Sequence, residues 1–324
     1  MNFIRTRLAP SPTGALHLGH ARTFLITWWL ARNCGAQVIM RMEDLDAARR
    51  KAESIQQAYG DLRWLGMDWD SAGSHTSFVQ SERMDFYADV LRQLQASGAI
   101  FPCVCTRKDI AENVAASVGA PHESEVSPRY PGTCRRFLGR SLEEVAREVG
   151  RPACWRLKVD SGAVAFDDAI MGPQSFDVAA DAGDFPLTRF DAAPAYQLAV
   201  VTDDHAMDID CVIRGDDLLS STPRQLLVYR ALGWSPPRFA HVTLVVGPDG
   251  KRLAKRHGES RVAQFREAGV RPERIVGWVA WRSGQIPSPV EMSAAEMIGR
   301  FDLAKLPRQR IVLGPEDFAW LRPS

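Results

Sequence analysis

Apolar positions follow first a strand period and then a helix period at the beginning of the chain. The apolar run at residues 3–8 predicts a strand, and helically spaced apolar residues from Leu18 to Asn33 predict a helix that ends before Gly35. Residues 37–42 are again mostly apolar and predict a second strand. A strand, a helix and a strand within about forty residues predict a βαβ unit with a right-handed crossover.

This α/β pattern is interrupted in the middle of the chain and then resumes. Ser81 predicts the N-cap of a helix over residues 82–96, and Gly98 predicts its end. The interruption holds a Gly/Pro/Ser-rich loop, a helix and short strands, at residues 117–132, 141–149 and 154–159. Beyond it we expect two strands and a helix, at residues 196–201, 210–214 and 222–232.

The order of these elements predicts an α/β fold, a doubly wound parallel sheet that an inserted domain splits. Residues 1–102 and 186–257 are the expected halves of the sheet domain. Residues 103–185 are the expected insertion, and residues 258–324 a small helical C-terminal segment.

Composition is that of an ordinary soluble chain of 324 residues, with 45% hydrophobic and 24% charged side chains and a net charge of +1. Residues 251–324 carry 14 Lys/Arg against 8 Asp/Glu, which suits a phosphate backbone and equally a solvated helix face. The N-terminus lacks a signal-peptide core, and the longest apolar run, residues 24–31, is too short to cross a bilayer. We expect a cytoplasmic monomer without a membrane partner.

Two histidines stand where the first predicted helix begins. His17 and His20 are three residues apart, so both side chains can extend from one face of the helix. The first helical turn also offers free N–H groups and the positive end of the helix dipole, which suit phosphate. The segment indicates a nucleotide-phosphate site, although two solvated histidines at a helix start give the same pattern.

A second cationic segment is the glycine-flanked loop at residues 249–258. Lys255 in such a loop can reach over a triphosphate and neutralise the charge that grows in the transition state. Taken alone, the loop is equally typical of an exposed basic turn.

Three cysteines and a tyrosine form a candidate metal site. Cys103, Cys105 and Cys134 can supply three thiolates to a tetrahedral Zn²⁺ ion, with Tyr130, His122 or water as the fourth ligand. Spacing alone equally fits three unrelated cysteines. The other cysteines lie in apolar surroundings and are expected in the core: Cys34, Cys154 and Cys211.

The histidine and lysine segments together resemble the paired motifs of the class I aminoacyl-tRNA synthetases. Residues 17–20 resemble the HIGH signature and residues 252–256 the KMSKS loop, with Arg252 for its first lysine and Ala254 for its usual serine. Four more segments match the glutamate branch of this class in order: residues 7–14, 41–46, 196–204 and 213–218.

The resemblance implies a Rossmann-type catalytic domain in two halves, with the lysine loop in the second. Glutamyl-tRNA synthetases that read anticodons continue into a large helical region, whereas only 68 residues follow Arg256 here. Truncated relatives with a Cys-x-Cys and Tyr-x-x-x-Cys zinc site are the glutamyl-Q tRNA(Asp) synthetases. Their pattern favours Tyr130 over His122 as the fourth ligand and implies one structural Zn²⁺ in an acceptor-binding insertion.

The resemblance also implies which residues bind the substrates. Arg7 and Arg214 offer guanidinium forks to the two carboxylates of glutamate, in an order that the sequence leaves open. Glu43 can pair with its ammonium group, and Tyr196 can donate its hydroxyl. The turn beside Arg7 contributes Leu8, Ala9, Pro10 and Ser11. ATP, carrying Mg²⁺, is assigned to His17, Gly19, His20 and Lys255, with both histidines and Lys255 as the catalytic groups.

The implied reaction joins L-glutamate to ATP as glutamyl-adenylate without tRNA. Glutamate then passes to the cyclopentenediol of queuosine in the anticodon loop of tRNA(Asp). Three alternatives remain open at this stage: a truncated glutamyl-tRNA synthetase that charges the 3′ end of tRNA(Glu), a nucleotidyltransferase of the same fold that acts on a small molecule, and a non-catalytic RNA-binding module.

Overall fold

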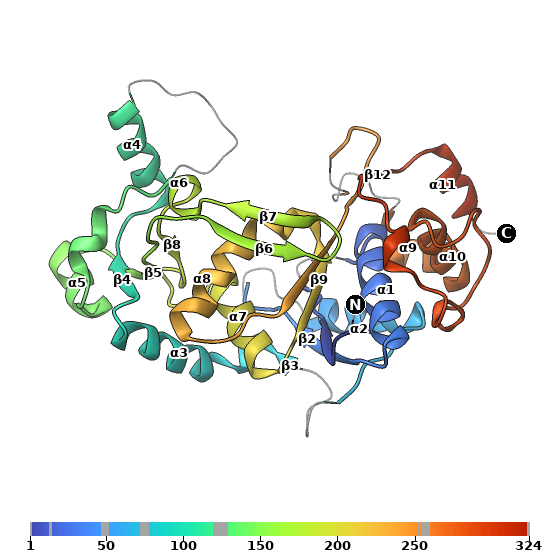
Figure 1. The fold of residues 1–324 in the computed structure, drawn as a ribbon, viewed down its shortest axis with the longest axis horizontal. Coiled ribbons are helices and arrows are strands. Elements are labelled where there is room, and N and C mark those ends of the chain that lie inside the picture. Colours follow the sequence, from blue (N-terminus) through green and yellow to red (C-terminus); the bar gives the residue numbers. More distant parts are fainter. Residues whose placement is uncertain are drawn as a thin grey trace.

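The computed structural model describes residues 2–12, 15–46, 52–71, 78–118, 129–251, 253 and 260–322, without the side chains of residues 113–118. Helices alternate with parallel strands through the middle of the molecule, which confirms the α/β class (Figure 1). In the same view, helices α4 (Arg107–Val118) and α5 (Leu142–Val149) lie at one end of the long axis, and the C-terminal segment lies at the other.

The predicted βαβ unit is present. β1 (Arg5–Leu8) pairs in parallel with β2 (Gln37–Met42), and α1 (Leu18–Asn33) connects them with the predicted bounds. β3 (Phe78–Val79) extends this sheet on the outer side of β2 and follows α2 (Ala52–Trp64). The burial of every residue of β2 except Gln37 explains its nearly continuous apolar sequence.

A second group of strands adjoins the first along β1. Its order is β7 (Gly172–Phe176), β6 (Val164–Asp168), β10 (Arg238–Val242) and β9 (Cys211–Gly215), with β10 parallel to both neighbours. Arg5 O accepts from Asp210 N at 3.2 Å, and Thr6 Oγ1 donates to Cys211 O at 2.8 Å, so β9 lies beside β1. The carboxyl ends of β1, β2 and β9 therefore meet at one edge, where α/β sheets bind their ligands.

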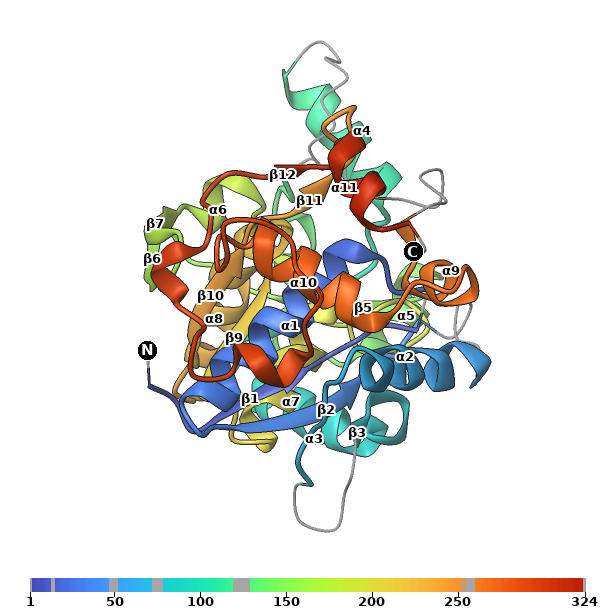
Figure 2. The ribbon, with the colours of Figure 1, turned by 90° about the vertical axis from the view of Figure 1, so that its right-hand side faces the viewer.

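The C-terminal segment packs against α1. It contains α9 (Val262–Glu267), α10 (Pro272–Arg282), β12 (Ile311–Val312) and α11 (Pro315–Trp320), and β12 pairs with β11 (Val245–Val246). Trp29 on α1 donates to Ala294 O at 2.9 Å, and the buried Arg22 donates to Ser283 and to Thr243 O. Figure 2 shows α10 against α1 in the perpendicular view. Across the described segments, no helix combines the length and apolarity needed to span a membrane.

Residues 103–185 contribute to two layers. One layer is an antiparallel sheet of β4 (Ile100–Cys103), β5 (Cys154–Leu157) and β8 (Phe185–Pro186). The short helix α6 (Val178–Asp181) precedes β8 in the chain. A separate hydrophobic cluster that includes Phe101, Tyr130 and Phe137 lies beside this sheet. β6 and β7, in contrast, belong to the sheet that contains β9 and β10. The domain boundaries stay a prediction.

Two local predictions were wrong. Residues 196–201 do not form a strand but begin α7 (Tyr196–Ala206), which is buried from Gln197 to Asp204. A continuous apolar run fits a buried helix as well as a buried strand, so its period could not separate them. Ser81 does not cap the next helix, α3 (Met84–Ala96), because its hydroxyl donates to Asp44 Oδ2 at 2.7 Å. The expected helix at 222–232 is confirmed as α8 (Thr222–Leu232).

Asp61 on α2 is a buried carboxylate with an unsatisfied oxygen. It is only 2% exposed, and its Oδ2 has no hydrogen-bond partner among the described residues. Burial raises the pKa of Asp61 from 3.8 to about 6, against the attraction of Arg266 on α9. The folded protein therefore holds this proton more tightly than the unfolded chain does, so ionisation of Asp61 costs stability as the pH rises through this interval.

We predict that Asp61→Asn raises the melting temperature at about pH 7.5 and that this gain disappears near about pH 3, where wild-type Asp61 is mostly protonated in both states. The measurement is thermal unfolding of both proteins across this pH range. Asp167→Asn, an exposed position on β6, is the control and should give no pH-dependent difference. A gain that is equal at both ends of the range would contradict the pKa argument.

Candidate functional site

The histidine pair lies at the N-terminus of α1, as predicted. His17 is the N-cap, and its Nδ1 accepts from Gly19 N at 3.2 Å. His20 Nδ1 accepts from His17 N at 3.4 Å, and the two rings stack with centroids 3.7 Å apart. A Cβ atom at Gly19 would lie 3.0 Å from His17 Cε1, so glycine allows this close packing. The two imidazoles share one face of the helix start, and their role in ATP binding stays a prediction.

The end of the lysine loop lies beside these histidines. Lys255 and its neighbours at 252 and 254–259 lie outside the described residues. On the N-terminal side, Gly247 N donates to Lys251 O at 2.8 Å, and Leu253 is buried in the main core. On the C-terminal side, Arg261 forms a β-bridge with His17, and Val262 N donates to Leu16 O at 2.8 Å. The fold thus brings the residues that directly follow the lysine loop beside the histidine segment.

A buried cluster of charges lies where β1 and β2 meet α7. Asp204 Oδ1 accepts from Arg7 Nε at 3.2 Å and from Arg41 Nη1 at 2.5 Å. Arg41 also donates through Nη2 to Glu43 Oε1 at 2.9 Å. Burial opposes the ionisation of Asp204, but Arg41 and Arg7 hold its pKa below the usual value. Asp204 therefore stays charged and fixes both guanidinium groups.

Arg214 on β9 lies in the same cluster with different partners. Its Nε donates to His241 Nε2 at 3.0 Å and one Nη to Thr222 Oγ1 at 2.8 Å, and none of its hydrogen bonds among the described residues reaches a carboxylate. Burial lowers the pKa of Arg214, and the nearby Arg7 lowers it further. A carboxylate ligand would relieve this repulsion.

A cavity of about 500 Å³ opens beside the charge cluster. Ser11, Glu43 and Tyr196, three of the residues expected to bind glutamate, line one part of it. Tyr196 keeps 38% of its surface exposed because it forms this wall, and desolvation raises the pKa of its phenol. Leu8 is fully buried in the core, and Pro10 O accepts from Glu43 N at 3.0 Å. These two residues hold the site in place; Ala9 is half-buried between them.

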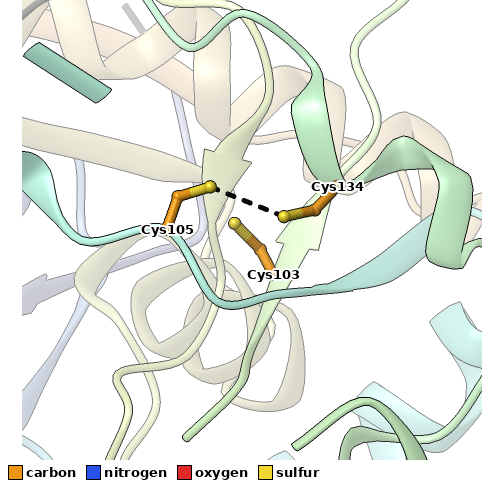
Figure 3. Close-up of side chains that lie close together, drawn as sticks. All are labelled: Cys103, Cys105 and Cys134. Atoms are coloured by element: carbon orange, nitrogen blue, oxygen red, sulfur yellow. Dashed lines mark hydrogen bonds between the residues drawn. The ribbon is translucent and has the colours of Figure 1, made fainter. Parts of the chain in front are cut away.

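The predicted metal ligands converge at the end of β4. Cys103, Cys105 and Cys134 are buried, and their Sγ atoms lie within 4.8 Å of one another (Figure 3). Cys105 and Cys134 approach to 3.5 Å, near the separation of about 3.8 Å that two thiolates on one tetrahedral Zn²⁺ would have. Tyr130 Oη lies 3.5 Å from Cys103 Sγ and accepts from Cys134 N at 2.8 Å. The donor set and geometry fit a metal ion.

Without a cation, the thiols of this cluster do not all ionise. The hydrogen bond with Cys103 raises the pKa of Cys105, and burial raises it further. Several buried thiolates need a cation to remain charged together. Cys154, expected and found in the core, lies opposite Cys103 in the antiparallel pairing of β4 with β5. The sequence did not predict this contact, because Cys154 lies far from Cys103 along the chain.

Four site residues received no role from the sequence: Arg41, Asp168, Asp204 and His241. Arg41 and Asp204 fall within the motif segments at 41–46 and 196–204, so their positions were marked but their pairing was not. Asp168 and His241 lie on β6 and β10 and reach the site through Arg214. Their sequence surroundings carry no local signature of this contact.

Comparisons with known proteins agree with this geometry. The family "tRNA synthetases class I (E and Q), catalytic domain" matches residues 3–311. The glutamyl-Q tRNA(Asp) synthetases of Symbiobacterium thermophilum and Rhodopirellula baltica are both 46% identical to this chain, the first over 97% of both chains and the second over 96% of both. The crystal structure of a glutamate tRNA ligase from Elizabethkingia meningosepticum in complex with its amino acid superimposes with a TM-score of 0.82 at 30% identity, covering 98% of this chain and 68% of that one. The chain belongs to the catalytic-domain family of the class I tRNA synthetases for E and Q, and within it to the glutamyl-Q tRNA(Asp) synthetases.

Proposed function

We propose that this protein activates L-glutamate with ATP in the absence of tRNA and transfers it to the queuosine cyclopentenediol of tRNA(Asp). Three relatives of nearly equal length, at 44–46% identity, carry the name of this activity. The observation that carries the proposal for this chain is the charge of the buried cluster.

The cluster holds one guanidinium group, that of Arg214, whose hydrogen bonds among the described residues reach no carboxylate. Its cations are Arg7, Arg41 and Arg214, and its anions are Glu43 and Asp204. Glutamate has two carboxylates and one ammonium group, so it brings one net negative charge, whereas glutamine brings none. A buried guanidinium group without a carboxylate partner is costly until a ligand carboxylate reaches it, and glutamate has a second carboxylate to supply where glutamine has a neutral amide. The cluster therefore favours glutamate over glutamine.

The chemical step needs positioning and charge stabilisation rather than a protein nucleophile. The α-carboxylate of glutamate attacks the α-phosphorus of ATP, forming glutamyl-adenylate and releasing pyrophosphate. His17, His20 and Lys255 stabilise the phosphates, whose charges Mg²⁺ shares, and Gly19 leaves room for the imidazoles. A queuosine hydroxyl then attacks the adenylate carbonyl, and AMP leaves.

The zinc-binding role rests on the cysteine cluster. We infer that Cys103, Cys105, Cys134 and Tyr130 hold one structural Zn²⁺ within an insertion at residues 103–185, and that residues 1–102 and 186–257 form the two halves of the doubly wound catalytic domain. The buried three-thiol arrangement supports the metal. The monomeric state, the cytoplasmic location and the RNA contacts stay predictions.

The first prediction concerns activation and transfer. Purified protein should exchange labelled pyrophosphate into ATP with glutamate and without RNA, and glutamine should support little exchange because it lacks the matching charge. Labelled glutamate should then appear on tRNA(Asp) that contains queuosine, and not on the same tRNA without it.

The control RNA is tRNA(Glu), which tests the alternative of a truncated synthetase that charges a 3′ end. Esterification of tRNA(Glu), together with queuosine-containing tRNA(Asp) that receives no glutamate, would contradict the proposed acceptor. Exchange that no tRNA can discharge would favour a small-molecule nucleotidyltransferase, and absence of exchange would favour a non-catalytic RNA-binding module.

The second prediction concerns Arg214. Arg214→Met should raise the KM for glutamate by at least about tenfold, because a charged hydrogen-bond donor to a carboxylate is lost, while the KM for ATP changes little. Steady-state pyrophosphate exchange measures both constants. Arg230→Met on the exposed side of α8 is the matched control and should resemble the wild type.

The third prediction concerns the metal. Elemental analysis should find about one equivalent of zinc per chain. Cys105→Ser should lose most of the zinc and lower the melting temperature, whereas Cys34→Ser, a half-buried cysteine beside α1, should retain the metal. Full zinc in Cys105→Ser would exclude this residue as a ligand.

A further inference from the structure

A chain of hydrogen bonds crosses three adjacent strands behind the charge cluster. Asp168 on β6 lies 2.6 Å from His241 Nδ1 on β10, and His241 Nε2 lies 3.0 Å from Arg214 Nε on β9. Asp168 and His241 are almost completely buried, and Arg214 is 5% exposed. Three buried polar side chains in one row require each proton to have a defined place.

The chemistry of arginine fixes those protons. A guanidinium group only donates hydrogen bonds, so His241 Nε2 must accept from Arg214 and carries no proton. The ring proton therefore resides on Nδ1 and is donated to Asp168 Oδ2. Thr222 Oγ1 closes the arrangement, since it accepts from Arg214 Nη2 at 2.8 Å and lies 3.3 Å from His241 Nε2.

Asp168 is itself held in one orientation. Its Oδ1 accepts from the main-chain N–H groups of Ile170 at 3.0 Å, Met171 at 2.8 Å and His241 at 3.1 Å. Burial opposes its charge, but the hydrogen bonds from His241 and Met171 hold its pKa below the usual value. The carboxylate is thus a fixed acceptor at the end of the row, and its Oδ2 is the atom that faces the imidazole.

We propose that Asp168 and His241 are positioning residues that fix the tautomer of the imidazole and thereby orient the Arg214 guanidinium toward the amino-acid substrate. This inference rests on the proposed function, in which Arg214 binds a carboxylate of glutamate. Asp168 and His241 touch neither substrate; they act through Nε of Arg214 and leave the direction of its remaining N–H groups defined. A histidine fits between the acid and the arginine because a neutral imidazole accepts from Arg214 at one nitrogen and donates to Asp168 from the other.

The test is Asp168→Asn, which keeps the side-chain volume and replaces the oxygen that faces His241 with an NH₂ group. The asparagine oxygen should remain on the three main-chain N–H groups, so its NH₂ group faces His241 Nδ1. The imidazole then accepts at Nδ1 and carries its proton on Nε2, which points at the Nε–H of Arg214. We expect the KM for glutamate to rise by at least about tenfold and the KM for ATP to change by less than about threefold.

The matched control is Asp167→Asn, the same substitution one position earlier, where the side chain is exposed. A second pair of variants separates the hydrogen bond from packing. His241→Met removes the acceptor and should raise the KM for glutamate, whereas His241→Gln offers an amide oxygen to Arg214 and should bind glutamate more tightly than His241→Met. Nitrogen NMR of labelled histidine should show the Nδ1–H tautomer in the wild type and its loss in Asp168→Asn.

An unchanged KM for glutamate in Asp168→Asn would overturn the proposal. Equal rises in the KM for glutamate and for ATP, together with a lower melting temperature, would also overturn it in favour of a purely structural role. If the wild-type protein shows no glutamate-dependent exchange, the proposed function fails first, whereas exchange with unaffected variants refutes only the positioning role.

Discussion

The shared carboxylate of Asp204 is the contact on which the site depends. It receives Arg7 from β1 and Arg41 from β2, and all three side chains are at most 5% exposed. Removing such charges from water costs several kcal/mol per ion, an amount that close opposite charges can offset only with good geometry. Because Asp204 lies on α7, its ion pairs connect the first two strands to a helix from the second half of the chain. Glu43 and Arg214 then acquire fixed positions around a centre that is already charged.

The site is assembled from segments that meet only after folding. Arg7, Glu43 and Arg214 lie at the carboxyl ends of β1, β2 and β9, where parallel strands leave their last side chains beside one another. The histidines belong to the helix that follows β1, and the β-bridge between His17 and Arg261 connects that helix to the end of the lysine loop. One sheet edge thus brings together the arginines, the acidic residue and the histidine pair that the sequence singled out.

The sequence predicted those parts of the fold that have a local signal. The bounds of α1, β2 and α8 followed from apolar period and terminating residues, and the convergence of Cys103, Cys105 and Cys134 was expected from a spacing that allows a metal site together with the family resemblance. The period of residues 196–201 failed because α7 is buried on all sides, which removes the polar stripe that marks a helix. Asp168 and His241 were missed for a different reason. Their role exists only between strands that are distant in sequence, and each residue alone resembles an ordinary buried polar group.

The cavity also connects the charge cluster to the metal candidate. Its wall includes Glu43 and Tyr196 from the amino-acid side and Cys105 and Cys154 from the cysteine cluster. Cys105 is therefore both a candidate ligand and part of the surface that an acceptor group would approach. A metal ion there would fix the strand end that carries Cys103 and, through its pairing with Cys154, the neighbouring strand β5. Arg156 lies on the same strand β5 and also lines the cavity. Fixing β5 would therefore also fix the position of this cationic side chain in the cavity wall. A metal ion bound by the cysteines would in this way also order the wall of the cavity that faces Glu43 and Tyr196.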